Sequence, residues 1–230
     1  MKVITNIFGS SLGKKYVMAI SGGAMFLFVV GHLVGNLQIF LGPEAINRYG
    51  HFLQSNVEII WPARTGLSVM IALHIWSATK LSAENKAARL VPYANWNPTV
   101  ASYASRTMLM SGLIIFAFII YHLLHYTVMV KAINFTGQDF HTLEDAQGRH
   151  DIFTMMVTGF SNPVISLFYI IAIGLLCLHL SHGVSAMFQS LGLKNPAYTP
   201  LIDQASRVVA WLIFLGYVSI PTAILIGYGK

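Results

Sequence analysis

The sequence predicts an all-α membrane protein whose five helices cross the bilayer as one bundle, with the N-terminus in the cytoplasm. Of the 230 residues, 55% are hydrophobic and only 10% are charged, whereas an ordinary soluble domain has roughly 25% charged residues. The apolar residues gather in five segments of about 20 residues or more, the length that a helix needs to cross a bilayer. We therefore expect residues 1–230 to form a single membrane domain without a sizeable soluble part.

The five predicted spans lie at about 16–41, 62–82, 106–130, 163–189 and 208–228. The first span follows the basic pair Lys14 and Lys15, as the apolar part of a signal peptide would, but it is too long and lacks a clear small-residue cleavage site. We expect it to be retained as a helix. The one cysteine, Cys177, lies in the fourth span, so it cannot form an intramolecular disulfide or, alone, hold an iron–sulfur cluster.

Positive charge sets the predicted orientation. With the N-terminus in the cytoplasm, nine Lys and Arg residues fall on the inner side and five on the outer side, in agreement with the positive-inside rule. The net charge of +6 would suggest an anionic partner for a soluble protein, but here we expect membrane lipid and no nucleic acid. The inner set is Lys2, Lys14, Lys15, Lys80, Lys86, Arg89, Arg106, Lys194 and Arg207, and the outer set is Arg48, Arg64, Lys131, Arg149 and Lys230.

Two connections are predicted to lie on the outer surface. The first contains Gly42, Pro43 and Asn47 and is expected to be a loop. The second is the longest connection, residues 131–161, and its part 134–151 is polar and carries four carboxylates. We expect this part to form a lid or a short amphipathic element.

Histidines carry the functional prediction. His51, His141 and His150 fall in the outer connections, but the other six lie inside apolar spans. An imidazole in hydrocarbon must find a hydrogen-bond partner or a metal, so such residues are functional candidates. A hydrogen bond to a neighbouring helix is the alternative for any one of them. The six are His32, His74, His122, His125, His179 and His182.

Four of these histidines form two pairs by depth. Each lies beyond the middle of its own span, and successive spans run in opposite directions. The outer half of the bilayer therefore holds His32 and His122, and the inner half holds His74 and His179. The helical rise separates these two levels by on the order of 12 Å.

Each pair suits a haem. Two imidazoles from facing helices fill both axial positions of a haem iron, which then exchanges electrons without binding a substrate. Zinc is disfavoured because it usually takes further ligands. Two ligand assignments stay open. His122 and His125 are three residues apart and share roughly one helix face, and the same holds for His179 and His182, so either member of each set could bind iron. Depth favours His122 over His125 and does not separate His179 from His182.

Small residues fit the same prediction. Gly22, Gly23, Gly31 and Gly35 leave one side of the first predicted helix without side chains. A porphyrin can approach such a side, and so can another helix.

Four short motifs follow in order on four successive predicted helices. They are Gly-His-Leu-Val-Gly-Asn at 31–36, Ala-Leu-His-Ile-Trp at 72–76, Tyr-His-Leu-Leu-His at 121–125 and His-Leu-Ser-His-Gly at 179–183. With these motifs, nearly the whole chain resembles the di-haem cytochrome b membrane anchor of succinate:quinone oxidoreductases and fumarate reductases. The resemblance is to the type in which one chain with five helices forms the whole anchor.

The resemblance implies a ligand set. The family's ligand on the fourth helix stands two residues before a Ser and four before a Gly, as His179 does before Ser181 and Gly183. It therefore favours His179 over His182. The implied sets are His74 with His179 for the inner, proximal haem b, and His32 with His122 for the outer, distal haem b.

The resemblance also implies partners and a place in the cell. Flavoprotein and iron–sulfur subunits would dock on the cytoplasmic face of a bacterial inner membrane, and electrons would pass through the haems between the iron–sulfur subunit and a quinone, for which we expect menaquinone. The complex would be a succinate dehydrogenase of the respiratory chain and tricarboxylic acid cycle, and it can assemble into a higher oligomer. The chain alone cannot oxidise succinate, because it has no dinucleotide fingerprint and one cysteine.

Two clusters near span ends offer the protonatable or hydrogen-bonding groups that quinone chemistry needs. Glu58 and Trp61 lie on the outer side, and Tyr103, Ser105 and Arg106 lie on the inner side. The alternative is that Glu58 is a solvated carboxylate and Arg106 a positive-inside anchor. The residues predicted to neutralise haem propionates are Ser21, Lys80 and Arg106.

Two other functions compete with this prediction. A di-haem cytochrome b anchor of another quinone-linked dehydrogenase, such as a hydrogenase or formate dehydrogenase, is disfavoured by helix count and motif order. A haem-free transporter or channel could use intramembrane histidines to relay protons, but it does not require histidines at paired depths.

Overall fold

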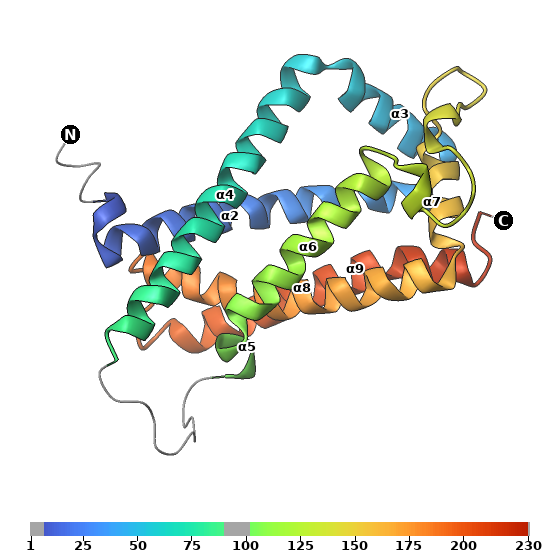
Figure 1. Ribbon diagram of the computed structural model, residues 1–230. Coiled ribbons are helices and arrows are strands. Elements are labelled where there is room, and N and C mark those ends of the chain that lie inside the picture. The colour runs from blue at the N-terminus through green and yellow to red at the C-terminus, as the bar shows by residue number, and fades with distance from the viewer. Residues whose placement is uncertain (1–6, 90–101, 230) are drawn as a thin grey trace. The chain divides into compact units, whose positions relative to one another are not determined.

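The computed structural model describes residues 7–89 and 102–229, and Lys2 and Lys230 of the basic residues counted above lie outside them. Every regular element in these ranges is a helix, apart from one isolated β-bridge. Five helices are long and apolar enough to cross a membrane, which confirms the predicted all-α fold with five spans (Figure 1). They are α2 (Ser11–Leu37), α4 (Val57–Ala87), α6 (Met108–Tyr126), α8 (Pro163–Ser190) and α9 (Thr199–Leu225).

Several helices extend beyond the predicted spans. The helix α4 begins five residues before 62 and ends five residues after 82, and α9 begins nine residues before 208. Hydropathy marks only the apolar part of a helix, whereas backbone hydrogen bonds continue into polar flanks rich in helix formers. Pro200 in the first turn of α9 suits a helix start, where its missing N–H costs nothing. In contrast, α6 ends at Tyr126, four residues before 130, and Met129 has a φ of 55°.

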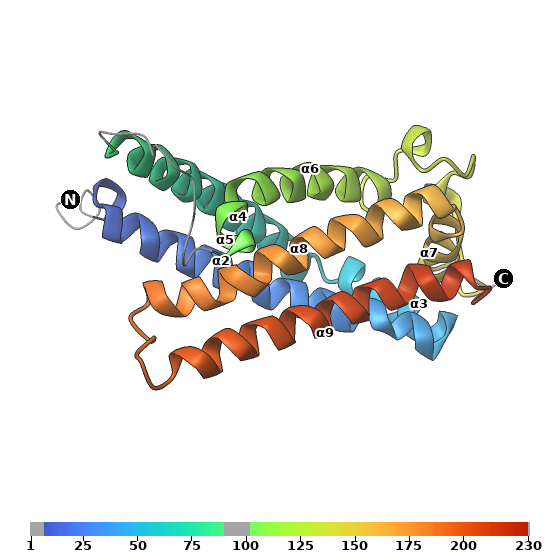
Figure 2. The same cartoon turned by 90° about the horizontal axis from the view of Figure 1, so that it is seen from below.

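Two further helices lie in the connections, one where a loop was expected and one directly after the segment 134–151, which was expected to form a lid or a short amphipathic element. The helix α3 (Pro43–Ser55) follows η1 (Gln38–Leu41), and α7 (Ile152–Phe160) lies between α6 and α8. Their starts carry recognisable signals, since Pro43 is the first residue of α3 and the carboxylate of Asp151 accepts from Thr154 N at 3.0 Å. Figures 1 and 2 show α3 packed against α7.

The chain divides into two compact units, and every span contributes a part to each. The first unit comprises Met1–Phe28, Thr65–Leu113 and Leu178–Ala210, so far as these are described. The second unit comprises Val29–Arg64, Ile114–Cys177 and Trp211–Lys230, again within the described residues.

The first unit contains two lysines that are paired inside the protein. Lys14 on α2 is 5% exposed and forms an ion pair with Glu84 on α4. Lys194 donates to Asp203 at 2.6 Å and to Ser185 at 2.8 Å. Because an ammonium group without a partner is costly to bury, these pairs tie the helices of the first unit together at defined positions.

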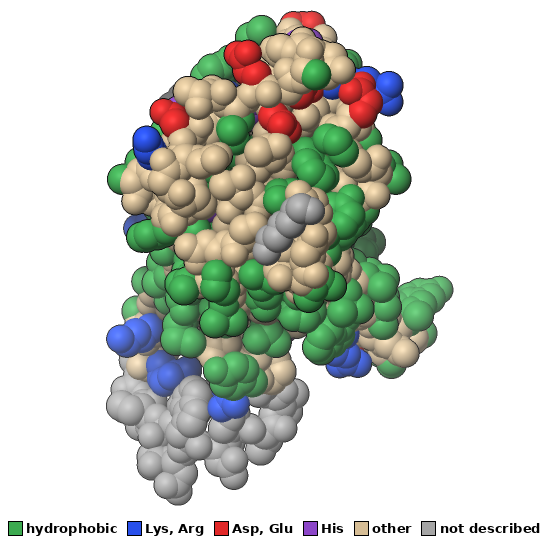
Figure 3. Space-filling view, turned by 90° about the vertical axis from the view of Figure 1, so that its right-hand side faces the viewer, with side chains coloured by type: hydrophobic (Ala, Val, Ile, Leu, Met, Phe, Trp, Pro, Cys, Tyr) green, Lys and Arg blue, Asp and Glu red, His purple; other side chains and the backbone are tan. Residues whose placement is uncertain are grey.

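In the second unit, a cluster of polar residues links α3 to the connection that precedes α7. Arg149 pairs with Glu44 at 2.6 Å and with Asp145 at 2.7 Å. Asn47 is 1% exposed and donates to Asp151 at 3.0 Å. We call these five residues the polar cap. Acidic side chains gather in the upper part of the face in Figure 3, beside hydrophobic ones.

Hydrogen bonds lower the pKa values of three cap carboxyl groups. The Arg149 guanidinium lowers the pKa of Glu44 mainly through a hydrogen bond. Burial acts to raise the pKa of Asp145, but hydrogen bonds from the backbone and side chain of Arg149 outweigh burial and lower it. The same balance holds for Asp151, whose pKa is lowered by hydrogen bonds from Thr154 and Asn47.

We expect acid to open the polar cap. Since the folded pKa values lie below the ordinary carboxyl values of about 4, the stabilisation is complete above about pH 5 and is lost as pH falls through the lowered values. Amide hydrogen exchange of residues 145–154, corrected for intrinsic rates, should therefore accelerate between about pH 5 and pH 3. Exchange in the middle of α8 serves as the control and should not change. If the exchange rates of the two regions changed with pH in the same way, the stabilisation of the polar cap by its ion pairs would be refuted.

Candidate functional site

The first unit brings the imidazoles of His74 on α4 and His179 on α8 together. Their ring centroids are 6.4 Å apart, with an interplanar angle of 63°. His74 Nδ1 is 3.3 Å from Ser21 Oγ and 3.2 Å from the carbonyl oxygen of Met18. His179 Nδ1 is 3.1 Å from Ser111 Oγ. Each imidazole is therefore held at Nδ1 by a group on a neighbouring helix.

The serines fix the tautomer of both rings. Ser21 Oγ donates to the Val17 carbonyl oxygen at 2.7 Å, and Ser111 Oγ donates to the Met108 carbonyl oxygen at 3.1 Å. With its hydrogen used in this way, each hydroxyl oxygen accepts from the histidine Nδ1–H. The Nε2 lone pair of both rings is then left for a metal.

A glycine follows each of these serines and faces the same imidazole. A Cβ atom placed on Gly22 would lie 3.2 Å from His74 Cε1, and one on Gly112 would lie 3.5 Å from His179 Cε1. The two ring edges therefore rest on helix surfaces without side chains. The sequence prediction named Ser21 for a haem propionate and Gly22 for the open side of the helix, but it missed Ser111 and Gly112, which repeat the same Ser-Gly dipeptide.

The second unit brings His32 on α2 and His122 on α6 together. Their ring centroids are 5.8 Å apart, with an interplanar angle of 78°. His122 Nδ1 is 3.4 Å from Tyr169 Oη, and the His32 ring lies 6.3 Å from the ring of Tyr217. Each of the two pairs that depth predicted thus lies within one compact unit.

The spacing of each pair would accommodate one metal ion between its two rings. A metal–imidazole bond is about 2 Å long, so the centroids of two rings on opposite sides of an ion are roughly 6 Å apart. The observed separations of 6.4 and 5.8 Å agree with this value. In the parts of the chain that are described, no group of three or more His, Cys, Asp or Glu side chains could hold a metal. Each pair therefore offers two imidazoles, the number that a six-coordinate haem would take and fewer than the ligands that zinc usually takes.

The two alternative histidines have different surroundings. His125 is fully buried, and its Nδ1 lies 3.0 Å from Tyr169 Oη. Its Nε2 has no hydrogen-bond partner among the described residues. His182 is only half-buried and interacts electrostatically with the ion pair of Lys194 and Asp203. His125 is therefore the stronger alternative.

The predicted quinone residues lie in two places. Glu58 and Trp61 are exposed on α4 in the second unit, where the Arg64 guanidinium stands 5.5 Å from the Trp61 ring centroid. The other three, Tyr103, Ser105 and Arg106, lie in the four-residue helix α5 (Tyr103–Arg106) in the first unit.

The residues predicted for haem propionates differ in exposure. Ser21 is buried against His74, whereas Lys80 and Arg106 are exposed. Of these three side chains, only that of Ser21 has a contact with a candidate ligand in the structure.

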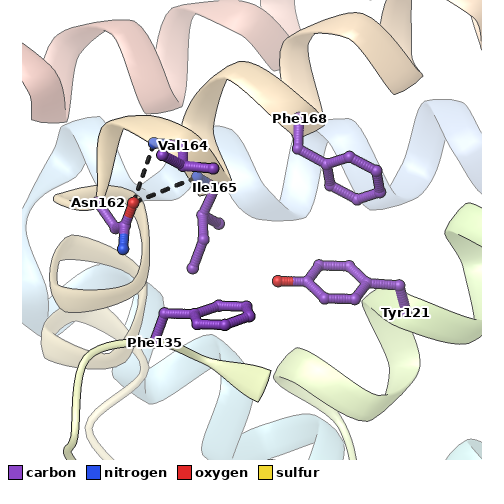
Figure 4. A pocket seen from close by; sticks show the side chains of 6 residues that line it. All are labelled: Tyr121, Phe135, Asn162, Val164, Ile165 and Phe168. Atoms are coloured by element: carbon purple, nitrogen blue, oxygen red, sulfur yellow. Dashed lines mark hydrogen bonds between the residues drawn. The ribbon is translucent and has the colours of Figure 1, made fainter. Parts of the chain in front are cut away.

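A cavity of about 400 Å³ lies in the second unit, where the residues before and after the α6–α8 connection meet (Figure 4). Its two polar side chains are already engaged, since Tyr121 Oη donates to the Ile133 carbonyl oxygen at 3.2 Å and Asn162 Oδ1 accepts from Val164 N at 2.9 Å. The wall is otherwise apolar and suits an apolar chain. The full lining of the cavity is Tyr121, Phe135, Asn162, Val164, Ile165 and Phe168, and of these only Tyr121 belongs to one of the four sequence motifs.

Comparison with known proteins identifies the family. Residues 84–219, more than half of the chain, match the model of the succinate dehydrogenase/fumarate reductase transmembrane subunit. The match includes His122 and His179 and begins after His74. Comparison with curated proteins and with solved structures finds no match. The chain therefore belongs to the family of transmembrane subunits of succinate dehydrogenases and fumarate reductases.

Proposed function

We propose that the chain is the di-haem cytochrome b membrane anchor of a succinate:quinone oxidoreductase. One haem b is held by His74 and His179, and the other by His32 and His122. The observation that supports this most directly is the geometry of the two pairs, with ring centroids 6.4 and 5.8 Å apart. Family membership supplies the kind of complex.

A haem held by each pair would supply reversible one-electron chemistry. Residues of this chain position the ligands. Ser21 and Ser111 orient the two imidazoles of the first unit, and Tyr169 contacts the imidazole of His122 in the second unit. With two histidines to hold each haem, the chain would use the haems for electron transfer and not for binding a small substrate.

The electrons connect an iron–sulfur subunit with a membrane quinone, for which we propose menaquinone. The iron–sulfur and flavoprotein subunits bind on the cytoplasmic face of a bacterial inner membrane, where the N-terminus lies. The ion pairs of Lys14 and Lys194 belong to the first unit, which contains the pair proposed for the proximal haem. Co-purification of these subunits with the chain, followed by a succinate-to-menaquinone assay, tests the proposal. A stable chain that carries haem but binds no such subunit would contradict it.

We place the quinone at Glu58 and Trp61, because both are exposed in the second unit, which also contains the distal pair. The carboxyl group of Glu58 can exchange the protons that quinone reduction needs. We expect Glu58→Gln to lower quinone turnover by about a hundredfold, the range for loss of a general acid, with unchanged haem content. Succinate oxidation measured with a soluble acceptor is the control and should be retained. Loss of turnover in Arg106→Gln but not in Glu58→Gln would move the site to α5.

A further inference from the structure

The hydroxyl group of Tyr169 lies between two histidines of the second unit. Tyr169 Oη is 3.4 Å from His122 Nδ1 and 3.0 Å from His125 Nδ1. Tyr169 is 5% exposed and His125 is 0% exposed. The histidines were candidates from the sequence, but the tyrosine that joins them comes from another helix, α8, 47 residues beyond His122 and 44 beyond His125.

Packing holds this hydroxyl group in place. The Tyr169 ring meets the ring of Phe118 at 5.1 Å and that of Phe160 at 5.0 Å, with interplanar angles of 83° and 89°. Edge-to-face contacts of this kind are favourable and directional. The ring therefore cannot turn its hydroxyl group toward lipid or solvent without losing these contacts.

The positions of the histidine protons determine which group donates and which accepts in the two hydrogen bonds of Tyr169. A histidine that binds iron through Nε2 carries its proton on Nδ1 and donates it to the Tyr169 oxygen. The Tyr169 hydrogen is then left to donate to Nδ1 of the other histidine, which carries its own proton on Nε2. The order applies whether His122 or His125 is the ligand, because Tyr169 reaches Nδ1 of both.

We infer that Tyr169 is a positioning residue for the haem of the second unit: it accepts the Nδ1 hydrogen of the iron-binding histidine, fixes that tautomer and lowers the reduction potential of this haem. An imidazole that donates its Nδ1 hydrogen is a more basic ligand, and a more basic ligand stabilises the oxidised iron. The inference rests on the proposed function and adds a residue that acts through the ligand.

The test compares Tyr169→Phe with Tyr217→Phe in the purified complex, by spectroelectrochemical titration of both haems at one pH. Tyr217 is a matched control, because it is also near the histidine pair, 6.3 Å from the His32 ring, but its hydroxyl group donates to the Val29 carbonyl oxygen at 2.8 Å. Each substitution removes one hydroxyl group and keeps the ring.

We expect Tyr169→Phe to retain both haems and to raise the potential of one. At a fixed ambient potential, the ratio of oxidised to reduced haem should fall about tenfold, which is 59 mV for a one-electron couple. The other haem should keep its potential, because Ser21 and Ser111 hold its ligands. Tyr217→Phe should move neither. Two unchanged potentials in Tyr169→Phe would overturn the inference.

A second measurement leaves Tyr169 in place and therefore tests the inference even if Tyr169→Phe fails to assemble. Infrared difference spectra of the complex with ¹³C-labelled tyrosine should show a tyrosine C–O band that shifts with the redox state of one haem and persists in Tyr217→Phe. Absence of such a band would overturn the role of Tyr169. If the unchanged complex contains no haem, the proposed function itself fails, whereas two haems without a tyrosine response would refute only this inference.

Discussion

Replacing His74 by alanine is expected to reduce the haem content from two per chain to one and to abolish electron transfer from succinate to quinone. The substitution removes an axial ligand, and the remaining partner, His179, cannot hold a six-coordinate haem alone. The haem of the second unit should remain, because neither of its proposed ligands, His32 and His122, belongs to the first unit. Haem extracted from the purified variant and measured per chain is the readout.

Two further variants serve as controls for this result. His51→Ala is the control, since His51 is exposed on α3, and this variant should keep both haems. The double variant with His32 and His74 both replaced by alanine should contain none. Retention of two haems in His74→Ala would refute the pairing of His74 with His179.

A valine at position 22 is expected to displace the His74 imidazole and to remove the same haem without touching a ligand. A Cβ atom at Gly22 already comes within 3.2 Å of His74 Cε1, and the two methyl groups of valine need further space. Overpacking of this kind costs about 1–3 kcal/mol, and the ring relieves it by moving away from Ser21. The variant Gly22→Val should therefore show one haem per chain and a reduced absorption band of about half the height.

Gly66 on α4, the helix that carries His74, provides the matched control. A Cβ atom at Gly66 would meet nothing within 4 Å, although the change in helix propensity from glycine to valine is the same. Gly66→Val should keep both haems. Equal haem contents in the two variants would show that the close approach of Gly22 to His74 does not matter for binding.

The five spans could be predicted because hydropathy and length alone decide which segments a bilayer accepts. Depth along these spans also predicted which rings would meet, and the structure brings His32 beside His122 and His74 beside His179. Antiparallel neighbours and a constant rise per residue suffice for that prediction. The axial role of these histidines stays a prediction.

The groups that support the rings could not be predicted in the same way. Tyr169 and Ser111 reach histidines 44 and 68 residues away in the chain, and only the packing of helices determines such contacts. Asn47 and Asp151 of the polar cap are 104 residues apart. Two short helices, α3 and α7, were missed because their start signals lie in segments that appeared to be connections. Local patterns carry no information on partners so distant in sequence.

The distribution of charge along the sequence predicted the side of the membrane for the lysines but not their partners in the fold. Lys14 and Lys194 were counted as inner-side anchors, and the structure shows both largely enclosed and paired with Glu84 and Asp203. A count of basic residues treats every lysine alike. It cannot distinguish a lysine that faces lipid headgroups from one whose partner lies on a neighbouring helix.

The haem content of the purified chain tests the two-pair assignment most directly. Haem extraction with protein quantification, combined with electron paramagnetic resonance of the oxidised form, reports both the number of haems and their ligation. We expect two haems b per chain, both low-spin, with an α band that appears on reduction with dithionite. One haem per chain, none, or a high-spin iron at full occupancy would contradict two histidine pairs that each hold an iron porphyrin.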